Sequence, residues 1–151
     1  MTLNQAWQIS GVVIAIVCCA WAWRCGGPAE RRGAIYILTA WLLSVIFQSH
    51  QASGPGVWVN IIDILLLAAL VHLSVQSRKP WTLFAAACQL DTIASHMSQV
   101  FSGFSQWAYV VILGIWGGYG LLICLAIGTY NHQRETRRMR DTVEKPPTAS
   151  A

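Results

Sequence analysis

Long runs of apolar residues alternate with short polar or glycine-rich segments along almost the whole chain. A transmembrane helix takes roughly 20 apolar residues, and most of the runs are about that long. Turn-forming sequences separate the runs, with Gly26-Gly27-Pro28 after the first and Lys79-Pro80 after the third. The pattern therefore predicts an all-α integral membrane helical bundle with five transmembrane helices, at residues 6–23, 34–49, 57–77, 81–101 and 107–130.

The fourth segment fits this pattern least well, because polar residues fill one half of its helical wheel. Such a helix can also lie flat on a membrane surface. The basic residues decide between these arrangements, since all ten Lys and Arg fall within residues 24–32, 78–79 and 134–145. With five crossings the three clusters share one side of the membrane, and Lys and Arg are enriched in cytoplasmic loops. We therefore expect the N-terminus outside and the C-terminus in the cytoplasm.

The composition supports placement in a membrane. Of the 151 residues 55% are hydrophobic and 11% are charged, whereas soluble domains average about 25% charged residues. The formal net charge is +4. Because the basic residues stand at the ends of apolar runs, membrane topology explains them and no nucleic-acid partner is expected. No Lys or Arg precedes the first apolar run, so we expect that run to be retained rather than removed as a signal peptide.

Aromatic residues of the kind found at membrane interfaces, including Trp58, Trp81 and Tyr130, stand near the segment ends. Residues 1–132 form the predicted transmembrane domain, and residues 133–151 form a basic cytoplasmic tail.

The tail begins with a helical pattern. Opposite charges four residues apart, Arg137 with Asp141 and Arg140 with Glu144, favour continuation of the last helix. Pro146-Pro147 is expected to end it. The residues expected to bind anionic lipid headgroups or a cytoplasmic partner are Arg134, Arg137, Arg138 and Arg140.

Two carboxylates, Asp63 and Asp91, lie inside predicted membrane spans. An acidic side chain at the centre of a bilayer costs about 2.5–3.5 kcal/mol, so it faces the bundle interior, a partner or water. The tight turn at residues 78–80 makes the third and fourth segments an antiparallel hairpin, which brings Asp63 to the depth of His96. The sequence thus predicts an intramembrane polar seam, a candidate ion or proton site, that contains Asp63, Asp91, His96, Asn60, Gln89 and Ser95. The alternative is that these groups only form hydrogen bonds between helices, at about 0.6 kcal/mol per bond.

Small residues recur along the last predicted span, at Gly114, Gly118 and Gly128. Such residues let helices approach closely, either within the bundle or against another membrane protein. No haem site is expected, because His72 and His96 differ in depth by roughly 15 Å at 1.5 Å per residue. No metal or other cofactor is expected either.

The second half of the chain, residues 60–134, resembles a group of small, uncharacterised bacterial inner-membrane proteins of about this length. The resemblance rests on an aspartate in an apolar helix, here Asp63, and on Gln76-Ser77-Arg78 followed by Pro80-Trp81. It continues through Ser95-His96 and Trp107-Ala108-Tyr109. The resemblance implies a multi-pass protein of the bacterial plasma membrane, and it implies no particular activity.

These observations favour a non-enzymatic accessory or interaction protein of the inner membrane. Its expected partners are the lipid bilayer and either another membrane protein or further copies of the chain. The sequence contains no Gly-rich phosphate loop, nucleophile–base arrangement or clustered acid pair outside the spans. One alternative is a small transporter or proton-conducting protein that uses the polar seam. Another is a membrane-disrupting protein of phage type, which five spans and a polar hairpin favour less.

Overall fold

The computed structural model describes residues 3–48, 57–101 and 113–144. Within these residues the chain forms α-helices and one π-helical segment, with no strand. The elements in chain order are α1 (Leu3–Cys25), α2 (Pro28–Gln48), α3 (Val57–Ser77), α4 (Pro80–Phe101), η1 (Leu113–Gly120) and α6 (Leu121–Glu144).

The helices match the predicted segments closely. The second is longer than predicted, because it begins at Pro28, where proline suits the first turn of a helix. Part of the fifth predicted span, residues 107–112, lies outside the described residues. The rest is η1 and the start of α6, and α6 continues through the predicted domain boundary at residue 132 as far as Glu144.

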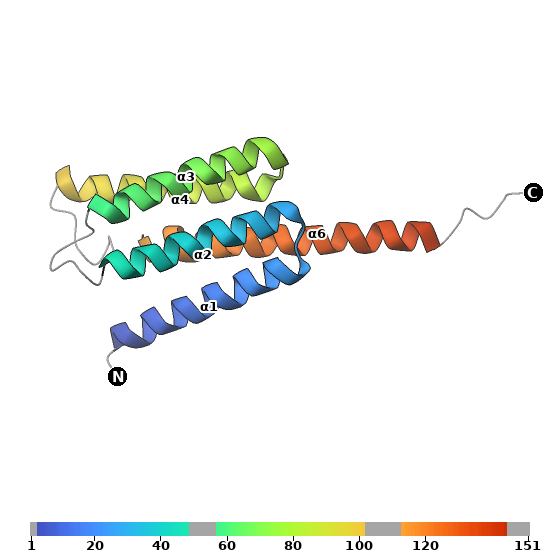
Figure 1. Cartoon of the computed structure of the whole chain (residues 1–151), viewed down its shortest axis with the longest axis horizontal. Coiled ribbons are helices and arrows are strands. Elements are labelled where there is room, and N and C mark those ends of the chain that lie inside the picture. The colour runs from blue at the N-terminus through green and yellow to red at the C-terminus, as the bar shows by residue number, and fades with distance from the viewer. Residues whose placement is uncertain (1–2, 49–56, 102–112, 145–151) are drawn as a thin grey trace, which may run out of the picture.

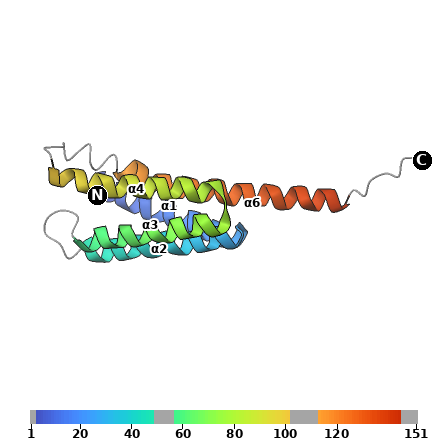
Figure 2. The same ribbon diagram turned by 90° about the horizontal axis from the view of Figure 1, so that it is seen from above.

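The bundle consists of two antiparallel hairpins, α1–α2 and α3–α4, with α6 packed beside them (Figure 1). Helix α4 runs along α3 in both views, as the hairpin prediction requires (Figure 2). Both hairpin turns lie at the same end of the bundle, and the second half of α6 projects beyond that end. We call this the basic end, because the described Lys and Arg residues lie at the two hairpin turns or on the projecting half of α6. They are Arg24, Arg31, Arg32, Arg78, Lys79, Arg134, Arg137, Arg138 and Arg140.

The turn between α3 and α4 is made by a residue in the left-handed conformation. Arg78 has φ 52°, and its backbone N–H donates to the Ser74 carbonyl at 3.0 Å. This is the usual way to close the last turn of a helix, although glycine is the common residue there. Pro80 then begins α4, so the chain reverses within three residues and Lys79 stands at the tip of the turn.

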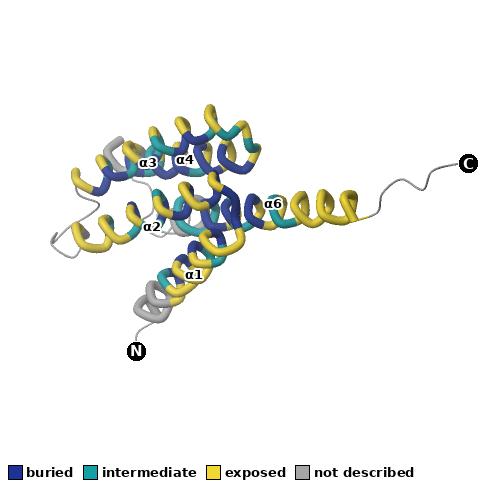
Figure 3. Tube along the Cα trace, turned by 45° about the vertical axis from the view of Figure 1, so that its right-hand side comes forward, coloured by how far each residue is buried: buried dark blue, intermediate teal, exposed yellow. Residues whose placement is uncertain are grey.

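Apolar side chains occupy both the core and much of the outer surface of the bundle. Large apolar side chains cover much of the outer surface, for example Val17 at 62%, Leu65 at 63% and Phe84 at 65% exposure. The interior combines an apolar core with buried polar side chains. Figure 3 marks which stretches of each helix are buried. The buried polar residues are Glu30, Thr82, Gln89, Thr92, His96 and Thr129.

Helix α3 is the one described helix that is both long and apolar enough to cross a membrane. The apolar part of α1, Ser10–Cys25, is shorter.

Candidate functional site

A hydrogen-bonded group joins α3 to α4 in the half of the bundle away from the basic end. We call it the Asp63 cluster; it consists of Asp63, Gln89 and His96. The Gln89 amide donates to Asp63 Oδ1 at 2.9 Å, and His96 Nε2 lies 3.1 Å from Oδ2. With Asp63 ionised, Nε2 must carry the hydrogen and donate it, because a carboxylate only accepts. The side chains of His96 and Asp63 are 3% and 13% exposed, so the group is almost closed to solvent and lipid.

Three of the six residues of the predicted seam, Asp63, Gln89 and His96, therefore come together in the structure. Gln89 also reaches the backbone carbonyl of Asp63 at 3.3 Å, so the amide fixes both the side chain and the main chain of α3. Asn60 lies one turn earlier on α3 with its Oδ1 buried and without a hydrogen-bond partner. Ser95 is half-buried, and its hydroxyl donates to the Asp91 carbonyl at 2.8 Å.

Asp91 does not join the cluster. It is exposed on the outside of the bundle, whereas Gln89, Thr92 and His96 are buried. At 100° per residue Asp91 lies about 140° around α4 from His96. The polar arc of this helix is wide, and only the part that includes Gln89 and His96 faces α3.

The Asp63 cluster is separated from the basic end by an apolar layer. On α3 the next buried residues toward the basic end are Leu66, Leu70 and Leu73, and on α4 they are Ala85 and Ala86. Among the described side chains there is accordingly no continuous polar path from Asp63 to the basic end. This geometry suits a structural role, in which hydrogen bonds hold α3 against α4, better than a role in a proton-transfer chain.

A second buried polar group lies at the basic end, and the sequence did not predict it. Glu30, in the first turn of α2, is 0% exposed. Its Oε1 accepts from Lys79 Nζ at 2.7 Å and from the Trp81 indole N–H at 2.9 Å, which ties the start of α2 to the α3–α4 turn. The neighbouring Arg32 guanidinium adds a link to Gln76 at 3.2 Å. The sequence feature that could have indicated this ion pair is an acidic residue, Glu30, next to basic ones, on the predicted cytoplasmic side that also carries Lys79.

Burial raises the pKa of Glu30, but the hydrogen bond and charge of Lys79 and the indole donor outweigh it and lower the pKa below 4.5. The folded state therefore binds this proton less readily than the unfolded state does. The ion pair contributes stability above pH 4.5, and that contribution is lost as the pH falls through the lowered pKa. We expect the difference in unfolding free energy between the protein and its Glu30→Gln variant to shrink over this range, as unfolding in detergent at several pH values measures.

Glycines make room for the Trp81 ring on both sides. A Cβ on Gly128 would lie 2.5 Å from Trp81 Cδ1, and a Cβ on Gly33 would lie 2.6 Å from Trp81 Cη2. Trp81 is 5% exposed. It thus packs between helices α2 and α6, not at a lipid interface as its position near a segment end suggested.

The other small residues of the last span differ in their surroundings. Gly118 faces Trp41, and a Cβ added to this glycine would lie 3.5 Å from Trp41 Cζ2, an ordinary contact distance. Gly114 lies in η1, and its contacts fall outside what the structure describes. Close packing is therefore found at Gly128 and ordinary packing at Gly118.

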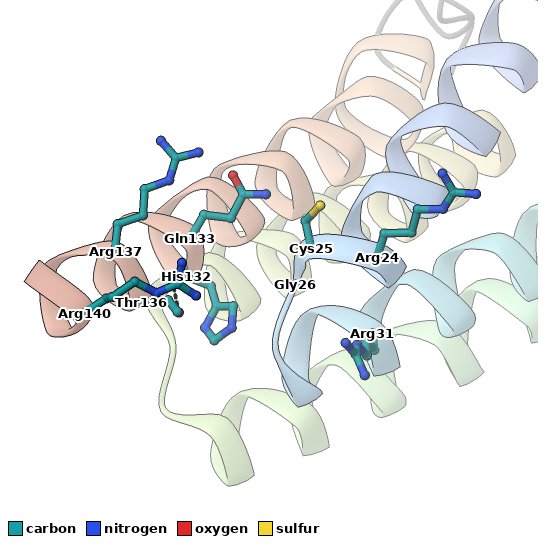
Figure 4. Close-up of a pocket in the computed structure, with 9 residues that line it drawn as sticks. All are labelled: Arg24, Cys25, Gly26, Arg31, His132, Gln133, Thr136, Arg137 and Arg140. Carbon is teal, nitrogen blue, oxygen red and sulfur yellow. Dashed lines mark hydrogen bonds between the residues drawn. The ribbon is translucent and has the colours of Figure 1, made fainter.

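The basic residues of the predicted tail fall on two sides of α6. Arg137 and Arg140 line a cavity of about 400 Å³ between the ends of α1, α2 and α6 (Figure 4). Arg134 and Arg138 do not line it; at 100° per residue they lie about 120° and 160° around the helix from Arg140.

The ion pairs expected along α6 do not form. The salt bridges found among the described residues are Lys79–Glu30 and His96–Asp63, and neither Arg137 nor Arg140 is paired with an acidic side chain on the next turn. Exposed pairs of this kind contribute little, because water screens them and the long side chains lose freedom when they are held.

The described residues contain no group of three or more side chains suited to hold a metal ion. Comparison with known proteins finds no match to a family model, a curated protein or a solved structure.

Proposed function

We propose that the chain is a multi-pass membrane protein of accessory type, without enzymatic activity. The observation that carries the proposal is the distribution of polarity: apolar side chains on the outside and hydrogen-bonded polar pairs on the inside. Exposed apolar surface of this extent is unfavourable in water and favourable in lipid. Polar side chains inside a membrane are expected to pair within the bundle, as the Asp63 and Glu30 groups do.

The proposal includes five crossings of the membrane, with the basic end in the cytoplasm. A 21-residue helix such as α3 is about 31 Å long at 1.5 Å per residue, close to the roughly 30 Å hydrocarbon core of a bilayer. The basic residues of both hairpin turns and of α6 gather at one end, which the positive-inside rule assigns to the cytoplasm. The resemblance to bacterial inner-membrane proteins would make this membrane the plasma membrane of a bacterium.

The accessory role is supported by the second half of α6. Residues 134–144 are exposed on every side and extend past the other helices (Figure 3). A helix that packs against nothing in its own chain gains little stability from tertiary contacts. A projecting, charged helix on a lipid-embedded bundle is suited to contact a cytoplasmic protein.

Photo-crosslinking in the membrane tests this role. A photoreactive amino acid at Arg138, on the projecting helix, is expected to give a discrete protein adduct. The control is the same group at Leu42, an apolar position of α2 that is 53% exposed, where only lipid adducts are expected. Equal adduct patterns at both positions, or recovery of the chain in the soluble fraction after alkaline extraction, would contradict the proposal.

A second candidate function is proton transfer through the Asp63 cluster, favoured by the 3.1 Å contact between a carboxylate and an imidazole. The apolar layer toward the basic end weighs against it. Measurement of proton flux in proteoliposomes decides between proton transfer and a purely structural role of the Asp63 cluster. A proton flux that falls in Asp63→Asn and His96→Ala but persists in Asp91→Asn supports transfer. If the proton flux is the same in all variants and in empty vesicles, the Asp63 cluster only holds α3 to α4.

A further inference from the structure

The cavity at the basic end is built from three helices. Arg24 comes from the last turn of α1, Arg31 from the first turn of α2, and Arg137 and Arg140 from the projecting part of α6. Figure 4 shows these side chains arranged around the point where α1 turns into α2 and α6 passes beside it, with His132 among them. Residues separated by more than a hundred positions in the sequence thus line one cavity.

No acidic side chain among the described residues forms an ion pair with the arginines at this place. None of the residues lining the cavity is acidic, and none of the four arginines takes part in an ion pair among the described residues. Two acidic residues are adjacent in sequence to these arginines: Glu30, beside Arg31, is held by Lys79 and Trp81, and Asp141, beside Arg140, forms no salt bridge among the described residues. The four arginines are exposed, so water and salt screen their mutual repulsion, and the positive charge of the lining favours an anion.

The guanidinium group is suited to a phosphate, because its planar fork of N–H donors matches two phosphate oxygens at once. The cavity is largely open at the surface of the molecule, and its volume of about 400 Å³ falls in the range of small-molecule sites. We infer that this cavity binds a phosphate group, and that its source is the headgroup of an anionic phospholipid.

The depth of the cavity favours the headgroup as the source. Trp23 and Tyr130, which lie within two residues of the lining residues Cys25 and His132, are 53% and 58% exposed. Exposed Trp and Tyr are typical of the interface between hydrocarbon and headgroups. Basic sites between helices at the cytoplasmic interface are suited to anionic lipids. This choice of source rests on the proposed membrane placement, whereas the phosphate chemistry rests on the arginines alone.

The two sides of α6 provide a matched test. One variant carries Arg137→Gln and Arg140→Gln in the cavity, and the control carries Arg134→Gln and Arg138→Gln on the other side of the same helix, with the same change of charge. Native mass spectrometry of the protein in neutral detergent counts bound phosphatidylglycerol and phosphatidylcholine. We expect the cavity variant to bind phosphatidylglycerol about thirtyfold more weakly, and the control to change by less than about threefold. A second variant, Arg24→Gln with Arg31→Gln, removes the opposite wall and is expected to match the first.

Competition by inorganic phosphate or glycerol 3-phosphate distinguishes the two sources. Loss of lipid binding in both cavity variants, with no competition at millimolar concentration, supports the headgroup. Equal competition by soluble phosphate supports a phosphate site and removes the lipid as its source. Equal loss in the cavity and control variants, or no preference for phosphatidylglycerol in the unaltered protein, overturns the inference. Failure of the membrane proposal appears separately, as protein in the soluble fraction after alkaline extraction.

Discussion

Replacing Glu30 with alanine is expected to lower the free energy of unfolding by about 2–4 kcal/mol. The change leaves the Trp81 indole N–H buried without its acceptor and removes the partner of Lys79. Lys79 is 30% exposed, so water replaces part of its interaction, and the cost falls below that of a fully buried pair. Unfolding in mixed detergent, followed by circular dichroism, measures the difference.

The matched control is Glu135→Ala, which removes an exposed acidic residue near the same end of the molecule. We expect this change to stay within about 0.5 kcal/mol of the unaltered protein, as exposed substitutions usually do. Glu30→Gln should fall between the two, because its amide oxygen still accepts from the indole. Equal stability of the Glu30 and Glu135 variants would show that the buried contact does not hold α2 to the α3–α4 turn.

Gly128→Ala is expected to destabilise the bundle by about 1–3 kcal/mol, because the added methyl group overpacks the contact between α4 and α6. The new Cβ would lie 2.5 Å from Trp81 Cδ1. The ring has little room to retreat, since Gly33 closes its other side and its N–H is bonded to Glu30. Thermal unfolding of the two proteins in the same detergent gives the difference.

Gly118→Ala is the control for this change, because its Cβ would meet Trp41 at an ordinary 3.5 Å. It is expected to be neutral or slightly stabilising, since alanine has the higher helix propensity. A double-mutant cycle completes the argument: in a Trp81→Ala background the cost of Gly128→Ala should nearly vanish. A cost that persists without the ring would mean that the glycine serves some purpose other than making room for Trp81.

The sequence was sufficient to predict which residues of the central hairpin share a depth. The turn at residues 78–80 fixes how far each residue of α3 and α4 stands from it, and this placed Asp63 beside His96. It did not fix rotation about the helix axis. The polar arc of α4 covers half of the wheel, and only packing against α3 decides which edge is buried. Asp91 was therefore included in the predicted seam although it lies outside the cluster.

Two features required the three-dimensional structure. Glu30 stands next to Arg31 and Arg32, so in the sequence it resembles one charge of an exposed connection rather than a buried acceptor. The contact of Trp81 with Gly33 and Gly128 depends on a large side chain of one helix filling the space left by small residues of two others. Spacing within one helix carries no information about such a fit.

Both buried groups place the same demand on the environment of the bundle. They satisfy polar side chains from within, while many large apolar side chains remain exposed, and the proposed membrane placement accounts for both features. We therefore propose that the bundle lies across a membrane with its basic end in the cytoplasm.

Labelling of single cysteines in spheroplasts tests this claim most directly. Cys25 ends α1 at the basic end and is exposed, whereas Val57 begins α3 at the opposite end and is 72% exposed. One protein keeps Cys25 as its sole cysteine, and the other carries only Val57→Cys. A membrane-impermeant maleimide should label the Val57→Cys protein in intact spheroplasts and Cys25 only after the membrane is opened. Labelling of Cys25 from outside, or equal labelling of both proteins in the soluble fraction, would contradict the account.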